Sequence, residues 1–187
     1  PSLLAALGLM LAAAWGYVVN DLFDIRADRL NRRPRPLADG SLEPSHARYA
    51  AALLLILTGI AAIVGSIITE PPWLFPLVLA GIIILEYAYA AQLRRLPVAG
   101  TLLTATLVSL TVIFPAMITR HTAAMGMTGK AALLDFTMTY ALFAFLATTA
   151  REQAKDMQDM DGDRLAGYLS IPICLGWTIA RRALLIN

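Results

Sequence analysis

Residues 20–36, NDLFDIRADRLNRRPRP, combine three aspartates with five arginines directly after an apolar run. Asp21, Asp24 and Asp28 are spaced i, i+3 and i+7, so a helix would present them on one face. Like charges on one face repel one another, and cations are therefore expected among them. Aspartates alone would indicate a metal site, whereas aspartates with interleaved arginines indicate a metal together with a phosphate.

The same spacing recurs in residues 151–167, REQAKDMQDMDGDRLAG, at Asp156, Asp159 and Asp163. Gly162 lies inside this second array and favours a bend there, which places the third aspartate less firmly than the first two. Six carboxylates brought together would repel strongly, and divalent cations are the natural remedy. Magnesium prefers oxygen ligands and is usually held by one or two carboxylates together with substrate phosphates. Two acidic arrays therefore predict two magnesium ions that bridge a diphosphate.

A polyphosphate also needs direct contacts from cationic side chains. Candidates for these contacts are Arg29, Arg32, Arg33, Arg35 and Lys155. Taken singly, an aspartate pair at a helix end is more often just solvated, and arginines beside a membrane span usually interact with anionic headgroups. Two arrays of identical spacing at the same side of the membrane favour a functional site.

The composition predicts the elements that must position these arrays. Of the 187 residues, 58% are hydrophobic and 15% are charged, and the mean hydropathy is +0.66. These values indicate an integral membrane protein, and the net charge of +2 is too small to indicate a nucleic-acid partner. Apolar runs of about spanning length predict an all-α, multi-spanning helix bundle. The runs cover residues 2–19, 49–69, 73–92, 101–119 and 131–150.

Both ends of the chain lie in apolar segments. Residues 168–177 are short and contain Pro172 and Gly176, so they predict a bent connection into a helix that begins near Thr178. The chain opens on Pro1 within a hydrophobic run. We therefore expect a single membrane-embedded domain, residues 1–187, that is incomplete at both ends and holds about five spans and part of another.

The distribution of cations predicts an orientation. Cations flank the first, third and fifth loops, at Arg26, Arg29, Arg32, Arg33, Arg35, Arg48, Arg94, Arg95, Arg151, Lys155 and Arg164, and the other loops hold only Arg120 and Lys130. The positive-inside tendency therefore places loops one, three and five on the cytoplasmic side. Because an even number of spans separates loop one from loop five, their chemistry should meet on that side.

These motifs resemble the signatures of the UbiA superfamily of intramembrane prenyltransferases. The first, NDxxDxxxD with a following asparagine and Arg-Pro pair, is matched by Asn20, Asp21, Asp24, Asp28, Asn31, Arg35, Pro36 and Gly40. The second, KDxxDxxGDxxxG, is matched by Lys155, Asp156, Asp159, Gly162, Asp163 and Gly167. A tyrosine-containing YxxxLKR stretch is matched by Tyr89, Leu93, Arg94 and Arg95, with arginine at the usual lysine position. The resemblance covers essentially the whole chain.

The resemblance implies a nine-helix bundle around a central cavity, of which this chain would supply the second helix to the start of the seventh. It further implies that the six aspartates hold magnesium on an isoprenyl diphosphate, with Asn20, Arg35, Arg94 and Lys155 binding the diphosphate. Asp24, Asp159, Tyr89 and Arg94 would then take part in catalysis, because the diphosphate leaves and an acceptor captures the allylic carbocation.

Several interpretations stay open from the sequence. The second motif looks most like the branch that attaches a geranylgeranyl group to geranylgeranylglyceryl phosphate, and an aromatic acceptor of the quinone, homogentisate or chlorophyll type is the alternative. A cation transporter or channel with acidic rings is a candidate of another class, and a soluble isoprenyl diphosphate synthase would need amphipathic helices, which these are not. Glu86, three residues before Tyr89, faces either the cavity or a hydrogen-bond partner on a neighbouring helix.

Overall fold

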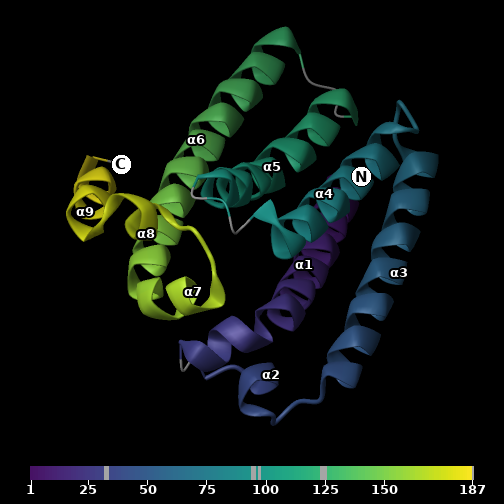
Figure 1. Ribbon diagram of the computed structural model, residues 1–187. Helices are drawn as coiled ribbons and strands as arrows, with labels where there is room; N and C mark the ends of the chain where they lie inside the picture. The colour runs from purple at the N-terminus through teal and green to yellow at the C-terminus, as the bar shows by residue number, and fades with distance from the viewer. Residues whose placement is uncertain (32–33, 94–95, 97, 123–125, 187) are drawn as a thin grey trace.

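A computed structural model describes residues 1–31, 34–93, 96, 98–122 and 126–186, and the regular structure in these ranges is helical (Figure 1). Five helices are long and apolar enough to cross a membrane, which confirms the predicted all-α bundle and its five spans. The helices are α1 (Ser2–Leu30), α2 (Pro36–Asp39), α3 (Pro44–Ile68), α4 (Leu74–Ala91), α5 (Ala99–Thr122), α6 (Met127–Gln158), α7 (Met160–Ala166), α8 (Ile171–Leu175) and α9 (Trp177–Ile186).

Helices α1 and α6 are both longer than the apolar runs that predicted them. Helix α1 continues past residue 19 through the whole first array to Leu30, and α6 continues past residue 150 to Gln158. Neither extension contains a proline or glycine that would end it. The first three carboxylates therefore lie on the last turns of a spanning helix.

The second array does not lie on one helix. Helix α6 ends at Gln158, Asp159 stands at the break with φ −95° and ψ 0°, and α7 begins at Met160. The predicted bend at Gly162 is therefore wrong, because Gly162 lies inside α7 and the chain turns three residues earlier. The predicted connection after residue 168 is confirmed: α8 is a short helix, and α9 begins at Trp177.

Helix α1 is the centre of the bundle, since it packs against α3, α4, α5 and α7. Ala5, Gly8 and Ala12 are buried on one of its faces. Small side chains at this spacing let helix backbones approach closely, as is common between helices in membranes. Phe75 and Leu79 of α4 fill the space against this face and are at most 1% exposed.

The two aspartate arrays lie at the same end of the bundle. Figure 1 shows the end of α1, the short helix α2 and helix α7 at this end, whereas the turn between α3 and α4 lies at the opposite end. Helix α6 reaches the array end as the partner of α5, which it contacts along its length. The Ser109 hydroxyl of α5 donates a hydrogen bond to the Ala141 carbonyl of α6 at 3.0 Å.

The outer surface of the bundle is apolar. On α3, exposed side chains follow the helical spacing at Leu53, Ile56, Ile60, Ile63 and Ile67. A continuous apolar stripe of this kind on the outside of a bundle fits a lipid environment. The inward face of the same helix is lined by small residues.

Substitution of Gly65, which lies on that inward face, tests the packing of α3 against α4. A Cβ atom at Gly65 would overlap the ring of Phe75, whereas a Cβ at Gly59 on the same helix would meet nothing within 4 Å. Gly65→Ala should therefore lower the free energy of unfolding by about 1–3 kcal/mol, seen as a lower Tm of the purified protein in detergent. Gly59→Ala is the matched control and should not lower it. Equal Tm values for the two variants would contradict the described contact of α3 with α4.

Candidate active site

The two aspartate arrays meet through hydrogen bonds between distant parts of the chain. The Asn31 side-chain amide, at the end of α1, donates to Asp163 Oδ1 in α7 at 3.1 Å. The Tyr168 hydroxyl, which follows α7, donates to Asp24 Oδ1 at 3.4 Å. Packing of α1 against α7 therefore sets the distance between the two sets of carboxylates.

Between the arrays is a small hollow of about 60 Å³, which we call the carboxylate hollow. Asp28 and Asp159 at its wall are only 8% and 7% exposed. Within the described residues, no three His, Cys, Asp or Glu side chains are grouped closely enough to hold an ion by themselves. The polar lining of the hollow consists of Asn20, Asp21, Asp24, Asp28, Asn31, Arg35, Tyr89, Lys155, Asp156, Asp159, Asp163 and Tyr168.

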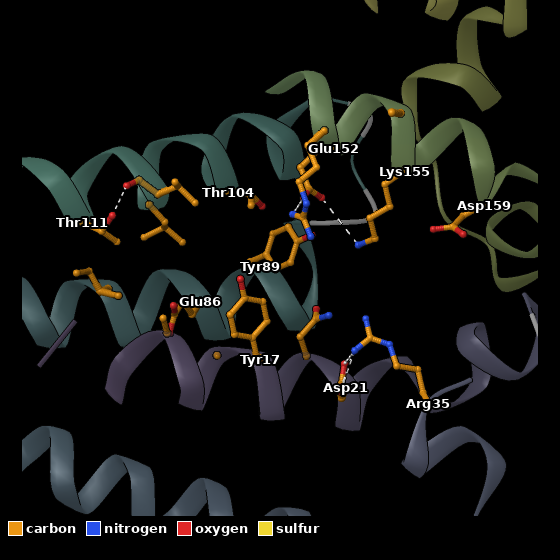
Figure 2. Close-up of a pocket in the computed structure, with 18 of the residues that line it drawn as sticks. Tyr17, Asp21, Arg35, Glu86, Tyr89, Thr104, Thr111, Glu152, Lys155 and Asp159 are labelled. Atoms are coloured by element: carbon orange, nitrogen blue, oxygen red, sulfur yellow. Dashed lines mark hydrogen bonds and ion pairs between the residues drawn. The ribbon is translucent and has the colours of Figure 1, made fainter. Parts of the chain in front are cut away.

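A much larger cavity of about 960 Å³, the main cavity, lies beside the hollow. Figure 2 shows its charged end, where Asp21, Arg35, Lys155 and Asp159 point toward one another. Its other end is mainly apolar, with Leu9, Ala13, Ile82, Leu107 and Val108 in its lining, and it also contains Glu86 and Thr111. The cavity therefore joins a charged mouth to an apolar interior, and Tyr89 lines both it and the hollow.

Two of the predicted cations line both spaces. Arg35 precedes α2, and its Nη1 lies 3.3 Å from Asp21 Oδ1. Lys155 Nζ lies 3.9 Å from Glu152 Oε2, one turn earlier on α6. Asn20 belongs to the same polar group, because its side-chain amide donates to Asp24 Oδ2 at 2.9 Å. These side chains place positive and hydrogen-bonding groups beside the aspartates.

The other predicted cations divide into two groups. Arg29 Nε donates to the Ala38 carbonyl at 2.9 Å and lines neither space, so it fastens α2 to α1 instead of facing the site. Arg32, Arg33 and Arg94, expected to contact phosphate, lie outside the described residues.

Two site residues were not predicted from the sequence. Glu152 is 6% exposed and accepts a 2.7 Å hydrogen bond from Arg151 while also facing Lys155, so it holds two cations at the cavity wall. Glu152 lies three residues before Lys155, and this helical spacing could have indicated that the two side chains face each other. Tyr168 follows the second motif and reaches Asp24 only through the turn after α7, so spacing gave no indication of it.

Carboxyl groups in the hollow oppose one another's ionisation. Burial raises the pKa of Asp163 to about 6, the Asn31 hydrogen bond partly offsets this, and the neighbouring Asp159 charge raises the pKa further. A nearby positive ion would have the opposite effect and favour the ionised form. The donor set therefore suits a hard cation that brings charge and takes oxygen ligands.

The close approach of α7 to α1 depends on Gly162. A Cβ atom there would overlap the Asn31 side chain. Gly162 is thus required where the second aspartate array packs against the first, and this contact gives the motif glycine a physical role that differs from bending the helix.

The chain was compared with known protein families and with solved structures. A model of the UbiA prenyltransferase family matches residues 1–186 of the chain. No solved structure gave a match.

Curated relatives are similar in sequence to most of this chain. A digeranylgeranylglyceryl phosphate synthase from Thermococcus sibiricus is 36% identical over 94% of the chain and 56% of its own length. Proteins of the same name from Methanobrevibacter smithii and Sulfolobus acidocaldarius are 34% and 31% identical, over 94% and 95% of the chain and 59% and 60% of their own lengths. The chain thus spans a little over half the length of these relatives.

Gly162→Ala should separate α7 from the end of α1, because the added methyl group displaces Asn31. We expect hydrogen exchange of the α7 backbone amides to become several-fold faster in detergent-solubilised protein. Gly126→Ala is the control, since a Cβ at Gly126 meets nothing within 4 Å. Unchanged exchange in the Gly162 variant would contradict the described packing of α7.

Proposed function

Because the chain belongs to the UbiA prenyltransferase family, we propose that this protein transfers an isoprenyl group from an isoprenyl diphosphate to an acceptor hydroxyl. The favoured donor is geranylgeranyl diphosphate and the favoured acceptor is geranylgeranylglyceryl phosphate. Curated relatives that are 31–36% identical are named for a glyceryl phosphate with two geranylgeranyl groups, which supports this choice. The observation that carries the proposal is the main cavity, which joins a charged mouth to an apolar interior.

The charged mouth would bind the diphosphate. Arg35 and Lys155 supply positive charge from α2 and α6, and Asn20 supplies an amide donor from α1. Arg94 is proposed as a further diphosphate contact by its place in the motif. Charge-assisted hydrogen bonds of this kind are about twice as strong as neutral ones.

The aspartates would hold magnesium rather than the diphosphate itself. Asp21, Asp24 and Asp28 from α1 face Asp156, Asp159 and Asp163 across the hollow, and each supplies the hard oxygen ligand that magnesium prefers. Because the ion normally keeps waters and takes phosphate oxygens, a cage of three protein carboxylates is not required. Bound magnesium would stabilise the negative charge that develops on the departing diphosphate.

The remaining cavity residues would control the steps after ionisation. Tyr89 lines the boundary between the hollow and the main cavity, where its ring face can stabilise positive charge on the allylic carbon. Leu9, Ile82 and Leu107 would bury the isoprenyl tail and exclude water from the cation. The acceptor oxygen then forms the new bond to the carbon from which the diphosphate has departed.

The orientation of the site is part of the proposal. The charged end of the bundle would face the cytoplasm, because cations flank loops one, three and five. Water-soluble diphosphate headgroups would then enter at the mouth while the isoprenyl tail enters the apolar interior.

Removing one carboxylate from either array should stop transfer. Asp24→Asn and Asp159→Asn each remove a metal ligand with little change in volume, so magnesium-dependent transfer should fall by about 100-fold or more. Insertion and folding should be unaffected. The assay measures labelled lipid product in membranes that contain each variant.

Asp161→Asn is the matched control for these variants. Asp161 lies between Asp159 and Asp163 in sequence, but it is exposed and lines neither the hollow nor the main cavity. Its variant should keep wild-type activity. Preserved turnover in Asp24→Asn or Asp159→Asn would refute a role for the two arrays in metal binding.

Lys155→Ala should act on donor binding, because it removes positive charge from the mouth of the cavity. We expect the KM for the isoprenyl diphosphate to rise about tenfold or more. Arg164→Ala also removes one cation near the second array, yet Arg164 is exposed and lines neither space, so its KM should not change. An unchanged KM in Lys155→Ala would exclude direct contact with the donor.

The acceptor is tested with membranes that contain the wild-type protein, magnesium and labelled geranylgeranyl diphosphate. One sample receives geranylgeranylglyceryl phosphate and another receives 4-hydroxybenzoate. Label in a doubly prenylated glyceryl phosphate supports the proposal. Label on the aromatic ring would instead favour an enzyme of the quinone type.

A further inference from the structure

Glu86 is a carboxyl group in the middle of an apolar spanning helix. It lies on α4 with Ile82 one turn before it and Tyr89 one turn after it, and all three line the main cavity. Its Oε2 atom is buried, and it has no hydrogen-bond partner within the described part of the chain. An ionisable group at such a position is costly and generally has a function.

The structure distinguishes between the two roles that the sequence left open. Within the described residues Oε2 has no hydrogen-bond partner, so this oxygen does not link α4 to a neighbouring helix. The carboxyl group instead occupies a space opposite Gly16 of α1, where an added Cβ atom would lie 2.5–2.9 Å from its three terminal atoms. Gly16 thus leaves room for the carboxyl group at the cavity wall.

Glu86 lies deeper in the cavity than the groups proposed to bind the diphosphate. It faces Gly16, which precedes Asn20 by four residues and Asp24 by eight on α1. At 1.5 Å per residue these offsets correspond to about 6 Å and 12 Å along the helix. Figure 2 shows Glu86 beside Tyr17, on the side of Tyr89 that is away from Asp21 and Asp159. Glu86 is one helical turn from Tyr89, which is proposed to lie beside the allylic carbon, so an acceptor that attacks this carbon would come within reach of Glu86.

Within the described part of the chain, the cations that line the cavity face carboxylates other than Glu86. Arg35 pairs with Asp21, and Arg151 and Lys155 both face Glu152. A neutral polar group brought by a substrate is therefore the natural partner for the Glu86 oxygen, because it would satisfy the oxygen without a further charge. An alcohol is such a group, since its hydroxyl donates one hydrogen bond.

We propose that Glu86 binds the acceptor's hydroxyl group and takes its proton, a role that rests on the proposed transfer function. The bond between the allylic carbon and the diphosphate oxygen breaks, and its electron pair leaves with the diphosphate. The hydroxyl oxygen then uses a lone pair to form the carbon–oxygen bond. Its proton passes to Glu86 when that side chain is in the carboxylate form, which becomes the neutral acid and later returns the proton to solvent.

Glu86→Gln tests this role with almost no change in shape. The amide can still accept a hydrogen bond but cannot take the proton, so kcat for transfer to geranylgeranylglyceryl phosphate should fall by about 100-fold or more. The KM for this acceptor should change little, and magnesium-dependent binding of geranylgeranyl diphosphate should equal that of the wild type. Glu86→Asp should recover part of the lost activity.

Gly16→Ala provides a second test that leaves Glu86 in the sequence. The added methyl group would displace the carboxyl group, so kcat should fall while donor binding is kept. Gly81→Ala is the control on α4, because a Cβ at Gly81 meets nothing within 4 Å. Its transfer rate should equal that of the wild type.

Three results would overturn the inference. One is a kcat of Glu86→Gln within threefold of the wild type, which would leave the diphosphate as the proton acceptor. Another is loss of geranylgeranyl diphosphate binding in both Glu86→Gln and Glu86→Asp, which would give Glu86 a structural role. Absence of transfer to any acceptor by the wild-type protein would instead refute the proposed function, and with it this inference, so the two failures are distinguishable.

Discussion

Mutual repulsion among six aspartates is the constraint on which the rest of this structure depends. Helices α1, α6 and α7 and the break at Asp159 bring these carboxylates to one hollow of about 60 Å³, where burial and neighbouring charge raise the pKa of Asp163 to about 6. Among the described residues, Arg35 and Lys155 supply compensating positive charge at this hollow. In the proposed function, a magnesium-bound diphosphate would bring a cation and additional oxygen ligands to this hollow.

Helix α1 both packs at the centre of the bundle and carries three of the six aspartates. One face of its first half, with small residues such as Ala5 and Ala12, is buried against α3, α4 and α5, and its last turns carry the first aspartate array. The packing of one helix therefore fixes the position of three carboxylates relative to α7. Gly162 and Asn31 complete this relation, because their close contact sets the approach of the second array. Stability and ligand binding share the same contacts.

Sequence patterns predicted the parts of this arrangement that depend on local spacing. Apolar runs predicted the five spans, and the i, i+3, i+7 spacing predicted a shared face for Asp21, Asp24 and Asp28, which α1 has. Features that depend on tertiary contacts could not be predicted in this way. The chain breaks at Asp159, whereas Gly162 lies inside α7 and packs against Asn31. Arg29 binds a backbone carbonyl of α2, and Tyr168 reaches Asp24 across 144 residues. Glu86 could be placed on the face of Tyr89, but only the structure shows its unsatisfied oxygen.

The most direct test of the central claim is electron paramagnetic resonance of Mn²⁺ bound to the protein in place of magnesium. The sample would contain geranylgeranyl thiolodiphosphate, an analogue whose carbon–sulfur bond resists ionisation. We predict that the ion binds together with the analogue and that its spectrum shows hyperfine coupling to phosphorus, because the aspartates and the diphosphate share the same ion. Bound Mn²⁺ without phosphorus coupling, or analogue binding that is equally tight without any divalent ion, would contradict the account.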